Sequence, residues 1–187
     1  MVKVKGTLIA AKRQYVLQHH GPDALRKVLD KLKDREAAKR LESVVLKSAW
    51  YPFDLWIDFT QTIDRVLGQG DGRLLRQMAK QTADDDLSSV YKVYFKSLQP
   101  MHVFDKAAQL WDAYYDSGRL QITKLGPSSV EMEILEFAAP HWVHCESALG
   151  WAERSVQLAG PKDVTADHVE CRGRGSSRCR MRITWKQ

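Results

Sequence analysis

Two of the three cysteines in the sequence lie close together, near its end. The stretch HVECRGRGSSRC, which begins at His168, places Cys171 and Cys179 on either side of a loop that contains Gly173 and Gly175. Glycines permit tight backbone turns, and a hairpin brings its two ends together. The spacing therefore predicts that both sulfur atoms face one point.

A third thiol and an imidazole could complete a metal site there. Cys145 is expected in the first turns of the helix before these strands, and three thiolates with one imidazole make the closed tetrahedral set of a structural zinc site. Strand alternation argues against His168, since it would place His168 and Cys171 on opposite faces unless a bulge intervenes. His141 or His144, just before Cys145, could replace His168. Buried free thiols are the ordinary alternative.

The bulk composition bounds the class of protein. The chain has 187 residues, of which 44% are hydrophobic, so we expect a single domain over residues 1–187 with its own core. Its apolar runs are far shorter than the ~20 residues that a membrane-spanning helix needs, and the run near the start is too short for a secretory signal. An odd number of cysteines argues against a disulfide framework. We therefore expect a cytoplasmic protein without a membrane span.

The net charge of +6 permits an acidic partner but does not require one. Positive charge concentrates only near the end, where five arginines lie between Arg172 and Arg182. They could bind nucleic acid, or they could form a solvated strand face with Arg180 and Arg182 across from Glu131 and Glu133. The sequence contains no helix-turn-helix or RNA-binding signature. We favour the strand face and do not expect a nucleic-acid partner.

Apolar residues recur at helical spacing over the first two thirds of the chain, and glycines and prolines mark the ends of these segments. After Gly118 the period changes to two, which is typical of half-buried strands. The sequence therefore predicts an α+β fold, in which a helix-rich part, 1–117, packs on a four-stranded antiparallel sheet formed by a β-β-α-β-β module, 118–187. The expected helices cover 7–19, 23–34, 35–44, 48–67, 74–98 (as two helices), 101–118 and 141–160, and the expected strands cover 119–126, 130–137, 164–171 and 179–185.

Aromatic residues gather in two segments of the helical part. They could line an apolar pocket for a small hydrophobic or aromatic ligand. At helical spacing they could equally be core residues, and a pocket in such a fold would be cut from the core. The candidate ligand-binding residues are Trp50, Tyr51, Phe53, Trp56, Phe59, Trp111 and Tyr115.

No pattern in the sequence points to catalysis. There is no Ser-His-Asp arrangement, no phosphate-binding loop and no dinucleotide fingerprint. The acidic cluster from Ala83 to Asp86 is better explained as the terminal region of a helix than as a metal site. We therefore do not expect an enzyme.

The C-terminal half resembles the 4-vinyl reductase-type domain, a small-molecule-binding module, in the version found in phenol-sensing bacterial activators. That resemblance implies structural zinc as the cofactor. This sequence departs from the family at His168, where the family has glutamate, and histidine is also a good zinc ligand. The metal ligands that the resemblance favours are Cys145, His168, Cys171 and Cys179. The matching residues are Cys145, Gly150, Trp151, Cys171, Gly173, Gly175 and Cys179.

Nearly the whole chain also resembles a family of uncharacterised proteins abundant in myxobacteria, through WYPFDLW, PMHVFDKAAQLWDAYYDSGRL and CRMRITW. Both groups resemble a wider fold shared by haem nitric oxide/oxygen-binding sensors and TRAPP vesicle-tethering subunits. By analogy with the sensors, His102 could be a haem ligand. The propionate-binding pattern expected of those sensors is missing, so we do not expect haem.

These observations favour a non-catalytic regulatory or sensor domain that binds a small molecule in an aromatic-lined pocket and is fastened by structural zinc. Its output would pass through a homodimer or a partner protein. The alternative is a protein-interaction adaptor of TRAPP-like fold without a small-molecule ligand. An enclosed void beside Trp50 and Trp56 would favour the sensor, and a filled core would favour the adaptor.

Overall fold

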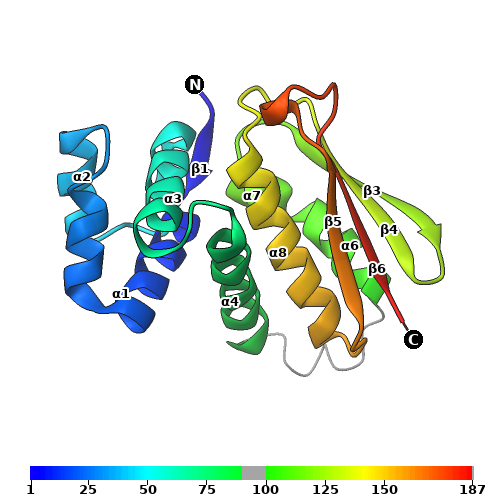
Figure 1. Ribbon diagram of the computed structural model, residues 1–187. Coiled ribbons are helices and arrows are strands. Elements are labelled where there is room, and N and C mark those ends of the chain that lie inside the picture. Colours follow the sequence, from blue (N-terminus) through cyan, green and yellow to red (C-terminus); the bar gives the residue numbers. More distant parts are fainter. Residues whose placement is uncertain (90–99, 187) are drawn as a thin grey trace.

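In this computed structural model the protein is described over residues 1–89 and 100–186. Helices form most of the first part, and a four-stranded antiparallel sheet belongs to the second part (Figure 1), so the predicted α+β class is confirmed. The second helix expected within 74–98 falls largely outside the described residues.

The helices are α1 (Gly6–Leu29), α2 (Arg35–Glu42), α3 (Phe53–Leu67), α4 (Arg73–Ser89), α6 (Pro100–Gln109), α7 (Trp111–Tyr114) and α8 (Trp142–Leu158). The strands are β1 (Lys3–Lys5), β2 (Trp50–Pro52), β3 (Arg119–Gly126), β4 (Ser129–Leu135), β5 (Val164–Glu170) and β6 (Arg180–Trp185), with a short 3-10 turn, η1 (Arg172–Arg174), between the last two.

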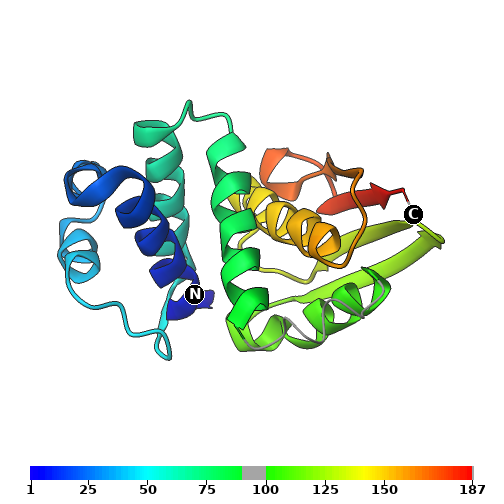
Figure 2. The same cartoon turned by 90° about the horizontal axis from the view of Figure 1, so that it is seen from below.

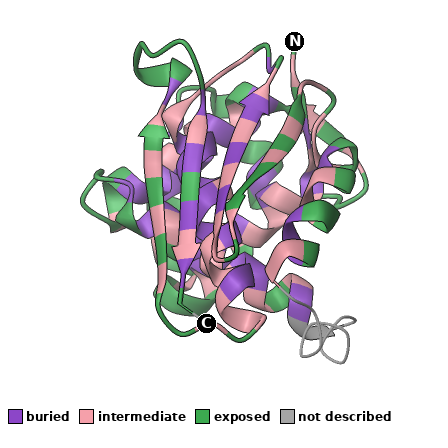
Figure 3. Cartoon of the chain, turned by 90° about the vertical axis from the view of Figure 1, so that its right-hand side faces the viewer, coloured by how far each residue is buried: buried purple, intermediate pink, exposed green. Residues whose placement is uncertain are grey.

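The larger sheet has the strand order β3-β4-β6-β5, and every neighbouring pair is antiparallel. Buried and exposed residues alternate along its strands (Figure 3), as the two-residue period of the sequence requires. On the outer face, Glu131 pairs in register with Arg182 and Glu133 with Arg180. Arg180 and Arg182 each lie 3.4 Å from a carboxylate oxygen of Glu131. The predicted charged strand face is therefore present.

Helices α8 and α6 cover the inner face of this sheet, and α4 packs on α8 (Figures 1 and 2). The α4–α8 contact is close because Gly150 has no side chain. A Cβ atom at this position would lie 2.7 Å from the carbonyl oxygen of Arg76 and 2.8 Å from its Cα. The two helix backbones could not approach so closely with a larger residue there.

Helices α1 to α3 lie on the far side of α4 from the sheet (Figure 2). Helix α1 contains a break at Gly21, where φ is +80°, so the helix end predicted there from glycine followed by proline is present as a kink. A two-stranded sheet of β1 and β2 was not predicted, because three-residue strands are too short to show alternation. Val4 of β1 also forms an isolated bridge with Tyr115. These contacts tie the start of the chain to the region before β3.

The main hydrophobic core includes residues from the helical part and from the sheet, such as Ile63, Met78, Leu149 and Ile183. These four residues lie on α3, α4, α8 and β6. In the described ranges, none of the helices has the length and apolarity needed to cross a membrane.

Candidate functional site

The three cysteines are far apart in the sequence but form one buried group. Cys145 lies in the first turns of α8, Cys171 follows β5, and Cys179 precedes β6. Their sulfur atoms all lie within 4.8 Å of one another, and Sγ of Cys171 is 4.0 Å from Sγ of Cys145. Each residue is at most 3% exposed. The hairpin and the helix therefore bring three thiols to one point.

The loop between β5 and β6 packs tightly on the start of α8. A Cβ atom at Gly173 would lie 2.8 Å from the Cα atom of His141 and from the backbone nitrogen of Trp142. Gly175 has a φ of +94°, a conformation that glycine adopts without strain. The backbone N–H of Arg172 points to Sγ of Cys179 at 3.4 Å. The glycines noted in the sequence thus allow the hairpin loop to press against the helix.

His168 reaches the same region because β5 is irregular at its end. The pairing of β5 with β6 shifts register between His168 and Glu170, which is the kind of bulge that strand alternation required. The Nδ1 atom of His168 lies 2.8 Å from Oε1 of Glu146, and the ring also interacts with the thiol of Cys171. The imidazole is therefore held by a carboxylate beside the cysteine group.

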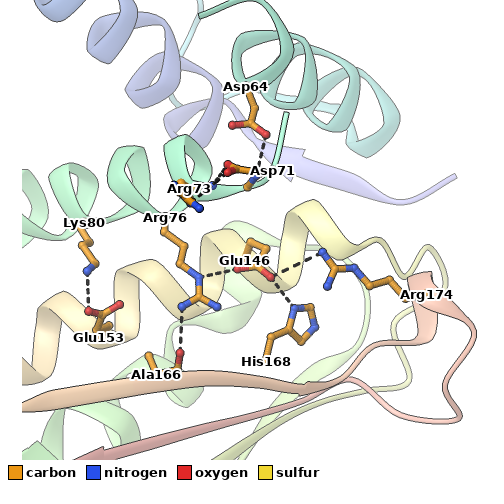
Figure 4. Close-up of polar contacts among 11 residues, drawn as sticks. Asp64, Asp71, Arg73, Arg76, Lys80, Glu146, Glu153, Ala166, His168 and Arg174 are labelled. Carbon is orange, nitrogen blue, oxygen red and sulfur yellow. Dashed lines mark hydrogen bonds and ion pairs between the residues drawn. The ribbon is translucent and has the colours of Figure 1, made fainter. Parts of the chain in front are cut away.

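Glu146 of α8 is the centre of a polar network that also includes residues of α4, β5 and the hairpin loop (Figure 4). Nε of Arg76, on α4, donates to Oε2 of Glu146 at 2.6 Å, and Nη1 of Arg76 donates to the carbonyl oxygen of Ala166, on β5, at 2.9 Å. Arg174 of the hairpin loop lies 4.0 Å from Oε1 of Glu146. The side chain of Glu146 is 9% exposed. This network holds α4, α8 and the loop around the cysteine group.

The contacts among the three cysteines, and between His168 and Glu146, shift the pKa values of these side chains. Hydrogen bonding among the thiols raises the pKa of Cys145 and lowers the pKa of Cys171 and of Cys179. Burial lowers the pKa of His168, but the hydrogen bond to Glu146 and its charge outweigh burial, and the pKa of His168 is raised. Three thiols beside an imidazole that is oriented by a carboxylate form a donor set that soft metal ions favour. Whether one ion is held by Cys145, His168, Cys171 and Cys179 stays a prediction, which metal analysis of the protein and of a Cys171→Ser variant tests.

His141 and His144, the alternative fourth ligands, are engaged elsewhere. Nδ1 of His141 accepts a hydrogen bond from the backbone N–H of Val143 at 3.2 Å, so His141 caps the N-terminus of α8. His144 is 1% exposed and lies among aromatic rings. Burial, assisted by the charge of His141, lowers the pKa of His144 to about 3, so the imidazole is neutral near neutral pH.

Five aromatic rings surround the imidazole of His144. The sequence analysis did not predict that His144 lies among aromatic residues. Their centroids lie between 4.7 and 5.9 Å from the centroid of His144, and several of the rings also contact one another. The rings therefore pack closely on one another. We call this group the aromatic cluster, and its members are Phe53 and Trp56 of α3, Trp111 of α7, Tyr115, Phe137 and His144 of α8.

Only part of the predicted ligand-binding set belongs to this cluster. Trp50 is 40% exposed, and Nζ of Lys5 lies 4.3 Å from the centre of its ring. The hydroxyl of Tyr51 accepts a hydrogen bond from the backbone N–H of Leu46 at 3.0 Å. Phe59 is fully buried on α3, without a described ring contact to the cluster. Phe137 and His144 were missed because neither lies in an aromatic-rich segment of the sequence.

A surface hollow of about 330 Å³ lies elsewhere, between α1 and the loop that joins α3 to α4. Its lining includes Tyr15, His19, His20, Asp71 and Arg73, and none of the predicted ligand-binding residues. The ring of His19 packs on that of Tyr15, with centroids 4.4 Å apart. This hollow therefore does not correspond to the pocket expected beside Trp50 and Trp56.

His102 lies in the first turn of α6 and is exposed. The next two residues, Val103 and Phe104, are buried in the core. Helix α6 packs on β3 and on α8, so His102 starts a helix that covers the inner face of the sheet. An imidazole is a common axial ligand of haem iron, and this donor is compatible with haem. The aromatic cluster is not such a site, because its rings already contact one another.

No protein-family model and no curated protein matches the chain in sequence. Solved structures do match its fold over nearly its whole length. An H-NOX protein from S. oneidensis in the Fe(II) ligation state is 14% identical, with a TM-score of 0.73 over 98% of this chain and 96% of that chain. A point mutant of the T. tengcongensis H-NOX is 16% identical, with a TM-score of 0.70 over 98% of each chain. An unliganded Fe(II) H-NOX mutant from K. algicida is 11% identical, with a TM-score of 0.71 over 98% of this chain and 97% of that chain. At these identities the likeness establishes the fold.

These matches correct the resemblances drawn from the sequence. Assignment to the 4-vinyl reductase-type domain is wrong, and so is the TRAPP-like fold of the adaptor alternative, because the structures that share this architecture are H-NOX domains. The resemblance to the family abundant in myxobacteria has no support from a family model, because none matches the chain. The resemblance to haem nitric oxide/oxygen-binding sensors is the part that holds. The error arose because a few cysteines and glycines carried the assignment, whereas the path of the whole chain decides the fold.

The cofactor expectation, structural zinc and no haem, is also wrong. The proteins with this fold are H-NOX proteins, and their descriptions refer to the Fe(II) state and to haem distortion. The argument against haem rested on a missing sequence pattern, which is a weak guide at 11 to 16% identity. The closeness of the three cysteines is a fact of the geometry that this correction leaves in place.

Proposed function

We propose that the protein is a non-catalytic sensor domain that binds a small molecule. The observation that supports this most is the match of nearly the whole chain to H-NOX domains, one of which is described as oxygen-binding and related to soluble guanylate cyclases. The buried charged groups around Glu146 support the absence of catalysis, since Glu146 bonds Arg76 and His168 within the fold. In this proposal those groups hold helices together and do not meet a substrate.

Haem is the cofactor that this proposal brings to the chain, with His102 as its axial ligand. The supporting observation is the place of this imidazole at the start of α6, on the helix layer that covers the sheet. When bound, haem would supply an iron atom that can bind a diatomic gas. The imidazole of His102 would hold the iron, and the next two residues, Val103 and Phe104, are buried in the core.

Haem titration of the purified chain tests the proposal. We expect an intense Soret absorption band at one haem per chain, and its loss or a large shift in His102→Ala. The matched control is His20→Ala, since His20 is also exposed but lies on α1. Circular dichroism would establish that both variants are folded. A chain that forms no specific haem complex, or one whose Soret band is the same in His102→Ala, would contradict haem ligation by His102.

We further propose that α8 carries the response to the ligand. Helix α8 contacts α4, α3, β5 and the hairpin loop, so a change in its packing reaches both halves of the fold. A ligand that binds one packing better than another shifts the population toward it. The output would then pass through a homodimer or a partner protein. Sedimentation of the chain with and without bound ligand tests this, and the same monomer fraction at all protein concentrations would contradict the homodimer.

A further inference from the structure

The contact between α3 and α8 contains two polar atoms that are buried without partners. The indole Nε1 of Trp56 and the imidazole Nε2 of His144 make no hydrogen bond to any residue in the described ranges. Each residue is 1% exposed. Their rings meet at 90°, with centroids 5.9 Å apart. A hydrogen-bond donor and a ring nitrogen thus lie in neighbouring side chains, and neither is used.

Two hydroxyl groups extend this polar region along the same helices. Thr60 lies one turn after Trp56 on α3, and Ser147 lies one turn after His144 on α8, so each pair shares a helix face. The Oγ1 atom of Thr60 and the Oγ atom of Ser147 are also buried, and no described residue offers them a partner. Helices α3 and α8 therefore carry further buried polar atoms near this pair, and Asp58 and Asp64 of α3 also have one oxygen each without a described partner.

Such a group of atoms is costly unless something binds to it. An unsatisfied buried donor or acceptor destabilises the fold, and native proteins leave few of them without a partner. The indole N–H of Trp56 can only donate. A neutral imidazole with its proton on Nδ1 can accept at Nε2, and burial keeps His144 neutral. The pair therefore calls for a group that accepts from one atom and donates to the other.

We infer that the contact between α3 and α8 binds a small neutral molecule through one hydroxyl group. The hydroxyl oxygen accepts a hydrogen bond from Nε1 of Trp56, and its hydrogen is donated to Nε2 of His144. This inference rests on the proposed function, because it assigns a ligand class to a sensor domain. A hydroxyl is the simplest group that both accepts and donates at one atom.

The surroundings limit the ligand further. The rings of Phe53, Tyr115 and Phe137 that complete the wall around His144 are apolar and uncharged, so they favour a neutral ligand with an apolar body. Because these rings already contact one another, the body must be small. Short-chain alcohols have this chemistry. A buried water molecule shares the hydroxyl chemistry, and the experiment has to distinguish the two.

The test uses the full chain labelled with ¹⁵N, whose indole N–H signals are resolved by NMR. The signal of Trp56 is identified by its loss in Trp56→Phe. We expect 1-propanol to move this signal saturably, and ethyl methyl ether, an isomer that cannot donate, to move it much less. Removing one hydrogen bond in His144→Phe should weaken 1-propanol binding about fivefold to tenfold, with the aromatic wall retained. The matched control is Trp50→Phe, since Trp50 is exposed and lies outside the cluster, and it should bind as the unmodified chain does.

An unmoved Trp56 signal in the unmodified chain overturns the inference and leaves water as the occupant, and this measurement does not depend on any variant folding. Equal shifts with the alcohol and the ether also overturn it. The haem titration tests the proposed cofactor independently of the alcohol-binding experiment. A chain that binds haem through His102 but does not respond to 1-propanol refutes only the hydroxyl site, and a chain that responds to 1-propanol without binding haem refutes only the cofactor.

Discussion

A methyl group at Gly150 would lie 2.7 Å from the carbonyl oxygen of Arg76, so α4 and α8 are in backbone contact at this point. The obstructing atoms include the backbone of Arg76, which cannot turn away as the end of a flexible side chain can. Helix propensity alone would favour alanine over glycine by about 1 kcal/mol. At Gly150, helix packing therefore favours glycine whereas helix propensity favours alanine. The sign of the change in the free energy of unfolding on substitution by alanine shows which effect is larger.

We expect Gly150→Ala to lower the free energy of unfolding by about 1–3 kcal/mol, because the added methyl group forces α4 and α8 apart. Urea denaturation followed by circular dichroism measures this change. Gly126→Ala is the control, since no atom lies within 4 Å of a Cβ built at Gly126, and it should change stability by less than about 0.5 kcal/mol. A neutral or stabilising Gly150→Ala would mean that the two helices are not in close contact.

Two ion pairs between α4 and α8 should differ in strength because only one of them has a further hydrogen bond. Arg76 and Glu146 are 30% and 9% exposed, and Lys80 and Glu153 are 34% and 13% exposed, so burial is similar, but Arg76 also donates to the carbonyl oxygen of Ala166 at 2.9 Å. We expect Arg76→Met to cost about 2–4 kcal/mol, because it removes both hydrogen bonds and leaves the buried carboxylate of Glu146 without its arginine. Lys80→Met should cost at most about 1 kcal/mol. Chemical denaturation of both variants checks the order, and equal losses would contradict it.

Lys12 should make the stability depend on pH in the alkaline range. Burial, opposed in part by the charge of Asp86, lowers the pKa of Lys12 to about 8 from 10.5. Between these values the unfolded chain binds more protons than the folded chain, so stability rises with pH through this window. Below pH 8 the buried charge destabilises the fold, and Lys12→Met should raise the free energy of unfolding at pH 7 by about 1–3 kcal/mol.

The measurement for Lys12 is urea denaturation at pH 7 and at pH 10. The unmodified chain should gain stability from this group on going to pH 10, and Lys12→Met should lack that gain. Lys39→Met serves as the control, because the side chain of Lys39 is 70% exposed and pairs only with Glu36 at the surface. If Lys12→Met destabilises the chain at pH 7, the amine of Lys12 has a favourable partner and the prediction is wrong.

Gly173 should control access to the thiol group. A side chain there would meet the backbone of His141 and Trp142 at 2.8 Å, so Gly173→Ala should lift the hairpin loop from α8. A local loss of about 1.4 kcal/mol raises the open population tenfold, and the rate of thiol modification should rise by about the same factor. Reaction with a thiol reagent measures this rate. Ser176→Ala, at an exposed loop position, is the control, and equal rates in the two variants would contradict the prediction.

The sequence predicted the elements whose side chains show a regular period. Alternation in β4 and β6 was readable because Val130, Met132, Met181 and Ile183 face one core. The pairing of Arg180 with Glu131 followed from that alternation. The proximity of the cysteines was also readable, since hairpin geometry forces its two ends together. Local pattern and short-range geometry were sufficient for these features.

Other features depend on contacts that no local pattern encodes. The two-stranded sheet of β1 and β2 joins segments whose three residues show no period. The aromatic cluster gathers rings from α3, α7 and the segment after β4 around His144, and only the tertiary fold brings them together. The assignment to the 4-vinyl reductase-type domain was wrong for a similar reason, although the wider likeness to haem nitric oxide/oxygen-binding sensors holds. A motif of a few residues constrains one corner of the molecule, whereas H-NOX likeness lies in the course of the whole backbone.

The strand order also determines when the sheet can close during synthesis. Strand β6 occupies an interior position between β4 and β5, although it follows both of them in the chain. Until Trp185 leaves the ribosome, β4 and β5 each present an unpaired edge, and the β3–β4 hairpin alone is only marginally stable in water. A stop codon that removes β6 would therefore do more than shorten the protein. It would leave two open edges, and the nascent chain would be prone to aggregation.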